Sequence, residues 1–133
     1  MTAIPSETPV WGLTEVYFHY LAQVASSRAD AIKYLQNTPR GGVVGGFILS
    51  DAKGVEVFET SADHYARRFL SGDKGFLVQT NHLVDPSLSS YNPPWVAHTD
   101  TLERYNTVFQ HLTEATSGSV DFDFIKKLFS SMQ

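Results

Sequence analysis

Residues 46–59 read Gly-Phe-Ile-Leu-Ser-Asp-Ala-Lys-Gly-Val-Glu-Val-Phe-Glu, and this stretch decides the fold class. The continuous apolar run from Phe47 to Leu49 is typical of a buried strand. Residues 51–54, Asp-Ala-Lys-Gly, form a turn signature, and the β-branched and aromatic character of residues 55–60 indicates a second strand. The stretch therefore predicts a β-hairpin.

More strands are predicted after the hairpin. Residues 65–70 favour a third strand, and the Gly-Asp-Lys-Gly sequence at 72–75 is another turn signature. Residues 76–80 are apolar and β-branched enough to predict a fourth strand. We expect these strands to form an antiparallel meander.

Two helices are predicted before the hairpin. Apolar residues recur at helical spacing between residues 16 and 24. Ser26 or Ser27 offers an N-cap for a second, shorter helix, which ends before Pro39. The stretch over residues 1–11 has two prolines and small polar residues, so it predicts an extended arm.

Two more helices are predicted after a long connection, residues 83–98, which is rich in Pro, Ser and Asn. Long connections of this kind are commonly functional. Asp100 followed by Glu103 resembles a capping box, and apolar residues then repeat at helical spacing from Leu102 onward. Asp121 is the expected N-cap of the last helix.

Length and composition predict one folded domain over residues 1–133. The predicted elements place it in class α+β, with about four strands packed against about four helices. The chain is 42% hydrophobic and 13% aromatic, too apolar for a disordered chain. Its net charge of −4 and scattered basic residues argue against a nucleic-acid partner. Because it has neither a long apolar run nor a signal-peptide pattern, we expect no membrane partner and a cytoplasmic location.

The sequence contains no cysteine. This excludes disulfides, thiolate metal sites and a thiol nucleophile within these residues. The five histidines share no metal-ligand spacing, and no phosphate-binding or dinucleotide fingerprint occurs, so we expect no metal and no cofactor. We expect all five histidines to be surface or loop residues; they are His19, His64, His82, His98 and His111.

Two positions could carry chemistry on physical grounds. Asn81 follows the predicted fourth strand, where its amide could donate to a developing oxyanion, an interaction worth on the order of 3 kcal/mol when preorganised. It could equally begin a turn, a common place for Asn. Arg104 lies in the first turn of the predicted third helix, where its guanidinium could orient a nucleophile or remain a solvated charge.

The order of four segments resembles the linear-amide hydrolases of the N-terminal-nucleophile (Ntn) superfamily, which include penicillin acyltransferases and choloylglycine hydrolases. Residues 27–32 and 46–59 look like that family's central helix and hairpin. Residues 79–82, Gln-Thr-Asn-His, are similar to its Thr-Asn-His or Thr-Asn-Asn signature. Residues 102–105, Leu-Glu-Arg-Tyr, are similar to its Ser-x-Arg-Tyr or Arg-Phe helix start. The resemblance implies part of an αββα layered fold.

The resemblance also implies site residues. Asn81 and Arg104 become the catalytic residues, because the family places this Asn beside the nucleophile and oxyanion and uses this Arg to support the nucleophile. Thr80, His82 and Tyr105 become candidate substrate-binding residues. The implied substrate is a small acyl amide, cleaved or transferred through an acyl-enzyme.

One departure from the family matters most. The family attacks with an N-terminal cysteine, whereas this sequence has none. Thr2 would be a chemically valid nucleophile if Met1 were removed, but it precedes a predicted helix, whereas the family's nucleophile opens a strand. We therefore expect a partial domain that is inactive alone and that forms a homo-oligomer or pairs with a complementary chain.

Two other interpretations stay open. The chain could be a non-catalytic binding or oligomerisation module for a small acyl or amide ligand. Its pocket would lie between Asn81, residues 83–98 and the third helix, with Tyr91, Trp95 and Tyr105 as lining residues. The chain could also be a truncated fragment without independent function.

Overall fold

The structure is a computed structural model, and it describes most of the chain. Within the described part there are four α-helices, two short 3₁₀ helices and one three-stranded sheet, so the α+β class is confirmed. The predicted arm and Thr2 lie outside the described residues. The described ranges are 14–38, 45–61, 63–70, 75–115 and 118–130.

The sheet is the predicted antiparallel meander, with the strand order β1-β2-β3. Phe47 of β1 pairs with Phe58 of β2, and Phe58 pairs with Arg67 of β3. The turn between β1 and β2 ends at Gly54, whose φ of 140° favours glycine. The strands are β1 (Gly45–Asp51), β2 (Gly54–Thr60) and β3 (Tyr65–Phe69).

The predicted fourth strand is wrong, because residues 76–80 form no regular strand. Side chains bind the carbonyl groups of this segment instead. Arg68 Nη2 donates to the Val78 carbonyl at 3.0 Å, and Gln79 Nε2 donates to the Thr80 carbonyl at 2.9 Å. Backbone groups satisfied in this way do not require a neighbouring strand.

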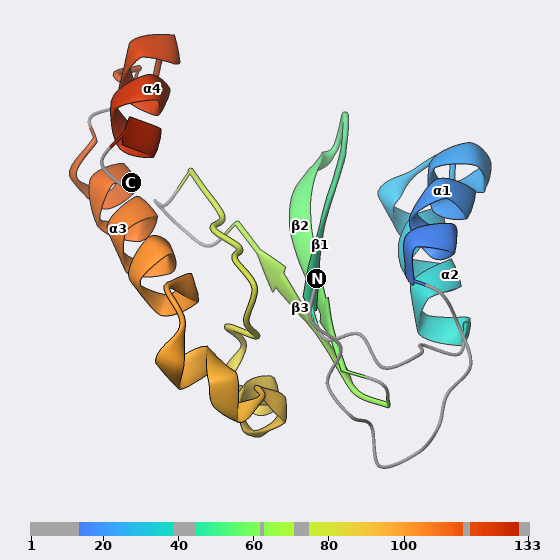
Figure 1. The fold of residues 1–133 in the computed structure, drawn as a ribbon. Coiled ribbons are helices and arrows are strands. Elements are labelled where there is room, and N and C mark those ends of the chain that lie inside the picture. Colours follow the sequence, from blue (N-terminus) through green and yellow to red (C-terminus); the bar gives the residue numbers. More distant parts are fainter. Residues whose placement is uncertain (1–13, 39–44, 62, 71–74, 116–117, 131–133) are drawn as a thin grey trace.

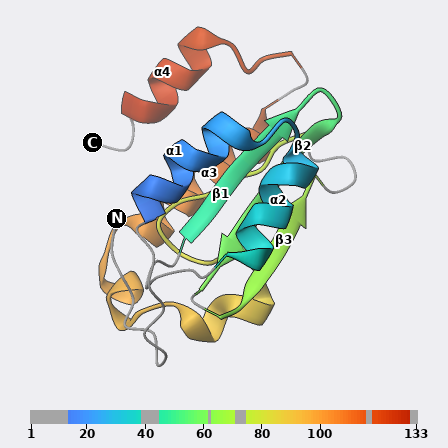
Figure 2. The same ribbon diagram turned by 90° about the vertical axis from the view of Figure 1, so that its right-hand side faces the viewer.

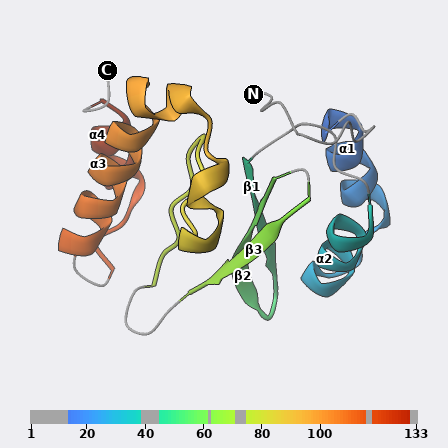
Figure 3. The same ribbon diagram turned by 90° about the horizontal axis from the view of Figure 1, so that it is seen from below.

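The elements form layers around the sheet (Figures 1, 2 and 3). Helices α1 and α2 cover one face, and α3 lies on the opposite side, with the segment over 75–98 between α3 and the sheet. The helices are α1 (Thr14–Val24), α2 (Arg28–Asn37), η1 (Pro86–Tyr91), η2 (Pro94–His98), α3 (Thr101–Glu114) and α4 (Phe122–Ser130).

The apolar core lies between α2 and the sheet. Phe47 and Phe58 are buried with their rings 6.5 Å apart, and they belong to one cluster with Ile32 and Leu35. Burying one such side chain stabilises the fold by about 1.5–3 kcal/mol. Ser27 caps α2 as predicted, since its hydroxyl accepts the Asp30 N–H at 3.2 Å.

The two C-terminal helices differ in how they begin. Asp121 caps α4 as predicted, and its carboxylate accepts the Phe124 N–H at 2.8 Å. The predicted capping box of α3 is wrong, because the Asp100 side chain makes no cap hydrogen bond. Its carboxylate binds Arg104 instead. No helix in the described ranges is long and apolar enough to cross a membrane.

Candidate functional site

The structure brings Asn81 and Arg104 together, although 23 positions separate them in sequence. Arg104 Nη2 donates to Asn81 Oδ1 at 3.0 Å. A guanidinium has only donors, so the Asn81 oxygen must face it. This bond uses the Asn81 amide oxygen and not its amide nitrogen, which carries two N–H donors.

Asp100 holds Arg104 in place. The Asp100 carboxylate accepts from Arg104 Nε at 3.0 Å and from Nη2 at 3.2 Å. Residues four apart lie on the same face of a helix, so the first turn of α3 supplies both partners. The guanidinium is held on two edges, by a carboxylate on its own helix and by Asn81 on another segment.

Thr80 and His82 flank Asn81 and join a buried hydroxyl cluster with Thr101. Thr101 Oγ1 accepts the Asn81 backbone N–H at 2.9 Å, and the Thr80 hydroxyl donates to the Thr101 carbonyl at 3.1 Å. His82 Nδ1 lies 3.0 Å from Thr80 Oγ1 and 3.2 Å from Thr101 Oγ1. The cluster fastens residues 80–82 to the start of α3.

His82 lies in a loop, as expected, but it is buried and not on the surface. Burial lowers the pKa of His82; the nearby Glu59 carboxylate opposes this shift, and Arg68 and Arg104 add to it. The imidazole therefore favours its neutral form. Tyr105 packs edge-on against it, with ring centroids 5.3 Å apart.

A buried ion pair supports the segment from beneath. Glu59 is fully buried on β2, and its carboxylate binds Arg68 Nε at 2.5 Å. The other Glu59 oxygen accepts the backbone N–H groups of Val84 and Asp85 at 2.9 and 2.8 Å. Arg68 also donates to the Gln79 side chain. Residues on both sides of Asn81 are therefore tied to the sheet by charged hydrogen bonds.

The comparison with known families shows which family the chain belongs to. The model of the acyl-coenzyme A:6-aminopenicillanic acid acyl-transferase family matches residues 19–131. The chain belongs to this family. The match confirms the Ntn-type resemblance as a partial one. Searches of curated proteins and of solved structures gave no significant match.

Tyr105 of this acyltransferase-family domain lines an open cleft beside the site. The cleft has a volume of about 310 Å³, and its apolar wall includes Phe76 and Phe109, whose rings meet edge-on 5.6 Å apart. Tyr91, expected near the same pocket, instead stacks on His64 at 4.6 Å. Trp95, also expected there, is half-buried in η2.

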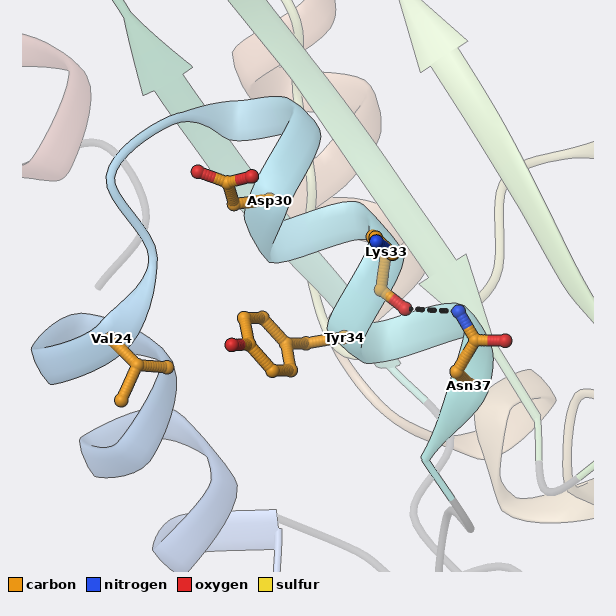
Figure 4. Close-up of a pocket in the computed structure, with 5 residues that line it drawn as sticks. All are labelled: Val24, Asp30, Lys33, Tyr34 and Asn37. Carbon is orange, nitrogen blue, oxygen red and sulfur yellow. Dashed lines mark hydrogen bonds between the residues drawn. The ribbon is translucent and has the colours of Figure 1, made fainter.

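A larger groove lies away from the site, between α1 and α2 (Figure 4). Its volume is about 580 Å³. Asp30, Lys33 and Tyr34 line it together with Val24 and Asn37, as the close-up shows. None of the candidate site residues belongs to it. Among the described residues, no group of three or more potential ligands could hold a metal ion.

Sequence reasoning missed several residues that support the site of this family member. The Glu59–Arg68 pair could have been predicted from the sequence. Acidic residues on β2 face a strand that carries two consecutive arginines, and this pattern predicts cross-strand pairs. Gln79 and Thr101 gave none, because their partners come from segments whose proximity the sequence does not reveal. Thr101 is among the most buried polar residues that the structure describes.

Proposed function

We propose that this chain is an acyl-transfer or amide-hydrolysis domain in which Asn81 stabilises the oxyanion and Arg104 supports the nucleophile. The observation that carries this proposal is the Arg104–Asn81 hydrogen bond of 3.0 Å. It links the two segments that resemble family signatures, and it uses the Asn81 amide oxygen and not the two amide N–H groups. Membership of the acyltransferase family supports the same chemistry.

The reaction would run through an acyl-enzyme. A thiolate attacks the carbonyl carbon of the acyl donor, and the carbonyl electrons move to oxygen, where the Asn81 amide donates. Collapse of this intermediate expels the leaving thiol or amine, which takes up a proton. An amine or water then attacks the acyl-enzyme and releases the nucleophile.

The nucleophile would lie outside these 133 residues, since they contain no cysteine. We therefore propose that this chain alone is catalytically inactive. It would work in the cytoplasm with a complementary chain or within an oligomer. Large apolar side chains that are exposed to solvent support the presence of a partner, because such side chains often mark an interaction surface. Among them are Phe122 at 76%, Phe129 at 64%, Ile48 at 59% and Phe69 at 51% exposure.

The first test is turnover by the purified chain. Hexanoyl-coenzyme A and 6-aminopenicillanic acid are incubated with it, and released thiol is measured with a colorimetric thiol reagent. The cysteine-free chain adds no background thiol. We expect no release above the buffer rate. Unaided turnover would contradict the silence of the chain.

The second test is binding of an acyl amide, measured by calorimetry with penicillin G. Asn81→Ala removes the proposed donor and should weaken binding up to about 10-fold, the worth of one hydrogen bond. The control is Asn106→Ala, an exposed asparagine on α3 outside the site. Equal affinity of both variants would contradict a role for Asn81 in ligand contact.

A ligand-binding module without catalysis is the second candidate function. The cleft beside Tyr105 favours it, since a small acyl group would fit among aromatic rings without any nucleophile. Phe109→Ala should then abolish binding of penicillin G, while Asn81→Ala leaves it unchanged. The opposite pattern supports the catalytic proposal.

A further inference from the structure

Thr101 is one of the most buried polar residues that the structure describes, with 1% of its surface exposed. It is the first residue of α3, directly after the N-cap residue Asp100. Here the hydroxyl turns to another segment: its oxygen accepts the Asn81 backbone N–H at 2.9 Å. A buried polar side chain at a helix start is thus devoted to a contact 20 residues away.

Thr101 also binds the residues on either side of Asn81. Its hydroxyl donates to Thr80 Oγ1 at 3.1 Å, and its carbonyl accepts the Thr80 hydroxyl at the same distance. The His82 ring nitrogen Nδ1 lies 3.2 Å from the Thr101 oxygen. One residue therefore contacts all three members of the Thr-Asn-His segment.

We propose that Thr101 is the positioning residue of the site, which holds the Asn81 backbone against α3 so that its side chain meets Arg104. Thr101 lies three residues before Arg104 on the same helix, so one rigid turn carries both contacts to Asn81. The Asn81 backbone is held from Thr101 and its carboxamide from Arg104. Neither contact alone fixes both the backbone and the side chain of Asn81, which is exposed.

This inference rests on the proposed function only for the catalytic roles of Asn81 and Arg104. The hold of Thr101 on the Asn81 backbone can be measured without turnover. The test is amide hydrogen exchange of Asn81 by NMR in Thr101→Val, which keeps the β-branched shape and removes the hydroxyl. Exchange of Asn81 should accelerate by about 10-fold, because its N–H loses its acceptor. The Arg104 Nε–H and Asn81 side-chain resonances should move with it.

Rescue and control variants separate positioning from general destabilisation. Thr101→Ser restores the hydroxyl and should return Asn81 exchange to the wild-type rate. Thr113→Val makes the same chemical change on the same helix, where the hydroxyl only bonds back to the Phe109 carbonyl, and should leave Asn81 unchanged. Unaltered Asn81 exchange in a folded Thr101→Val variant would overturn the proposal.

Should Thr101→Val fail to fold, the wild-type chain still tests the positioning role. Its nuclear Overhauser spectrum should connect the Asn81 amide proton with the Thr101 side chain, and absence of that signal overturns the proposal. A different result would contradict the proposed function. If Asn81 is loosened in Thr101→Val while penicillin G binds as before, the positioning holds and the site is not the acyl-amide site.

Discussion

The two faces of the sheet are held mainly by different forces, although the α2 face also carries the ion pairs of Glu56 with Arg28 and Arg67. On the α2 face, Phe47 and Phe58 pack with apolar helix residues, and the hydrophobic effect, which has no directional requirement, stabilises this contact. On the α3 face, Glu59 and Arg68 make short charged hydrogen bonds that tie down residues around Asn81. Apolar packing tolerates small shifts, whereas hydrogen bonds need defined geometry. The face that needs positional accuracy is the one that carries the candidate site.

β2 carries one buried glutamate on each face. Glu56 and Glu59 point to opposite faces. Glu56 binds Arg67, whose side chain is 37% exposed, and Arg28, which also pairs with Asp51. Glu59 binds Arg68, whose side chain is 15% exposed. Without Glu56, Arg67 can be hydrated and Arg28 keeps Asp51, whereas without Glu59, Arg68 loses its carboxylate partner.

The largest effect is expected from Glu59→Gln. It leaves the Arg68 charge, whose side chain is only 15% exposed, without its carboxylate partner, so the free energy of unfolding should fall by about 4 kcal/mol. Urea unfolding measures this loss, and NMR should show the Asn81 and Arg104 resonances moving. Glu56→Gln is the matched control and should cost clearly less, with the site unmoved. Equal losses for the two variants would remove the distinction between the faces.

Leu35→Ala should be the next largest change. It empties part of the apolar core and should lower the free energy of unfolding by about 3 kcal/mol. Because α2 lies across the sheet from the site, the Asn81 and Arg104 resonances should stay in place. Leu102→Ala, at a position that is 40% exposed, is the control and should cost much less. Movement of the site resonances in Leu35→Ala would show that the faces are coupled.

A smaller effect is expected from pH, acting through the buried imidazole of His82. The pKa of His82 is lowered, chiefly by burial, from an ordinary value of 6.5. The unfolded chain therefore binds this proton first, and stability should fall as the pH drops from about 6.5 toward the lower folded pKa. Urea unfolding at about pH 7.5 and 5.5 tests this. His82→Gln should flatten the dependence; an unchanged slope would contradict it.

The sequence predicted elements that depend on local signals. The hairpin over residues 46–59, the Ser27 cap and the Asp121 cap all follow from residues close together in the chain, and the structure confirms them. The fourth strand over residues 76–80 failed for a physical reason. Its residue types favour a strand, but long side chains from Arg68 and Gln79 bind its carbonyls.

The site was predictable only in part. Sequence signatures selected Asn81 and Arg104, and the structure places them within hydrogen-bond distance, while their catalytic roles stay predictions. Thr101 and Gln79 were missed because their importance comes from partners distant in sequence. The predicted capping box at Asp100 was wrong because the Asp100 carboxylate binds the charged guanidinium of Arg104. This charged partner competes with the N–H groups at the start of the helix.

The most direct test of the central claim is an NMR titration of the labelled chain with penicillin G, following the Asn81 side-chain amide. We predict that the two Nδ2 protons shift as they donate to the ligand carbonyl. The Arg104 Nε–H signal should stay, because Nε keeps its bond to Asp100 and Nη2 keeps its bond to Asn81 Oδ1. Saturable shifts confined to these residues and their neighbours would support the account. Shifts elsewhere, with the Asn81 amide protons unmoved, would contradict it.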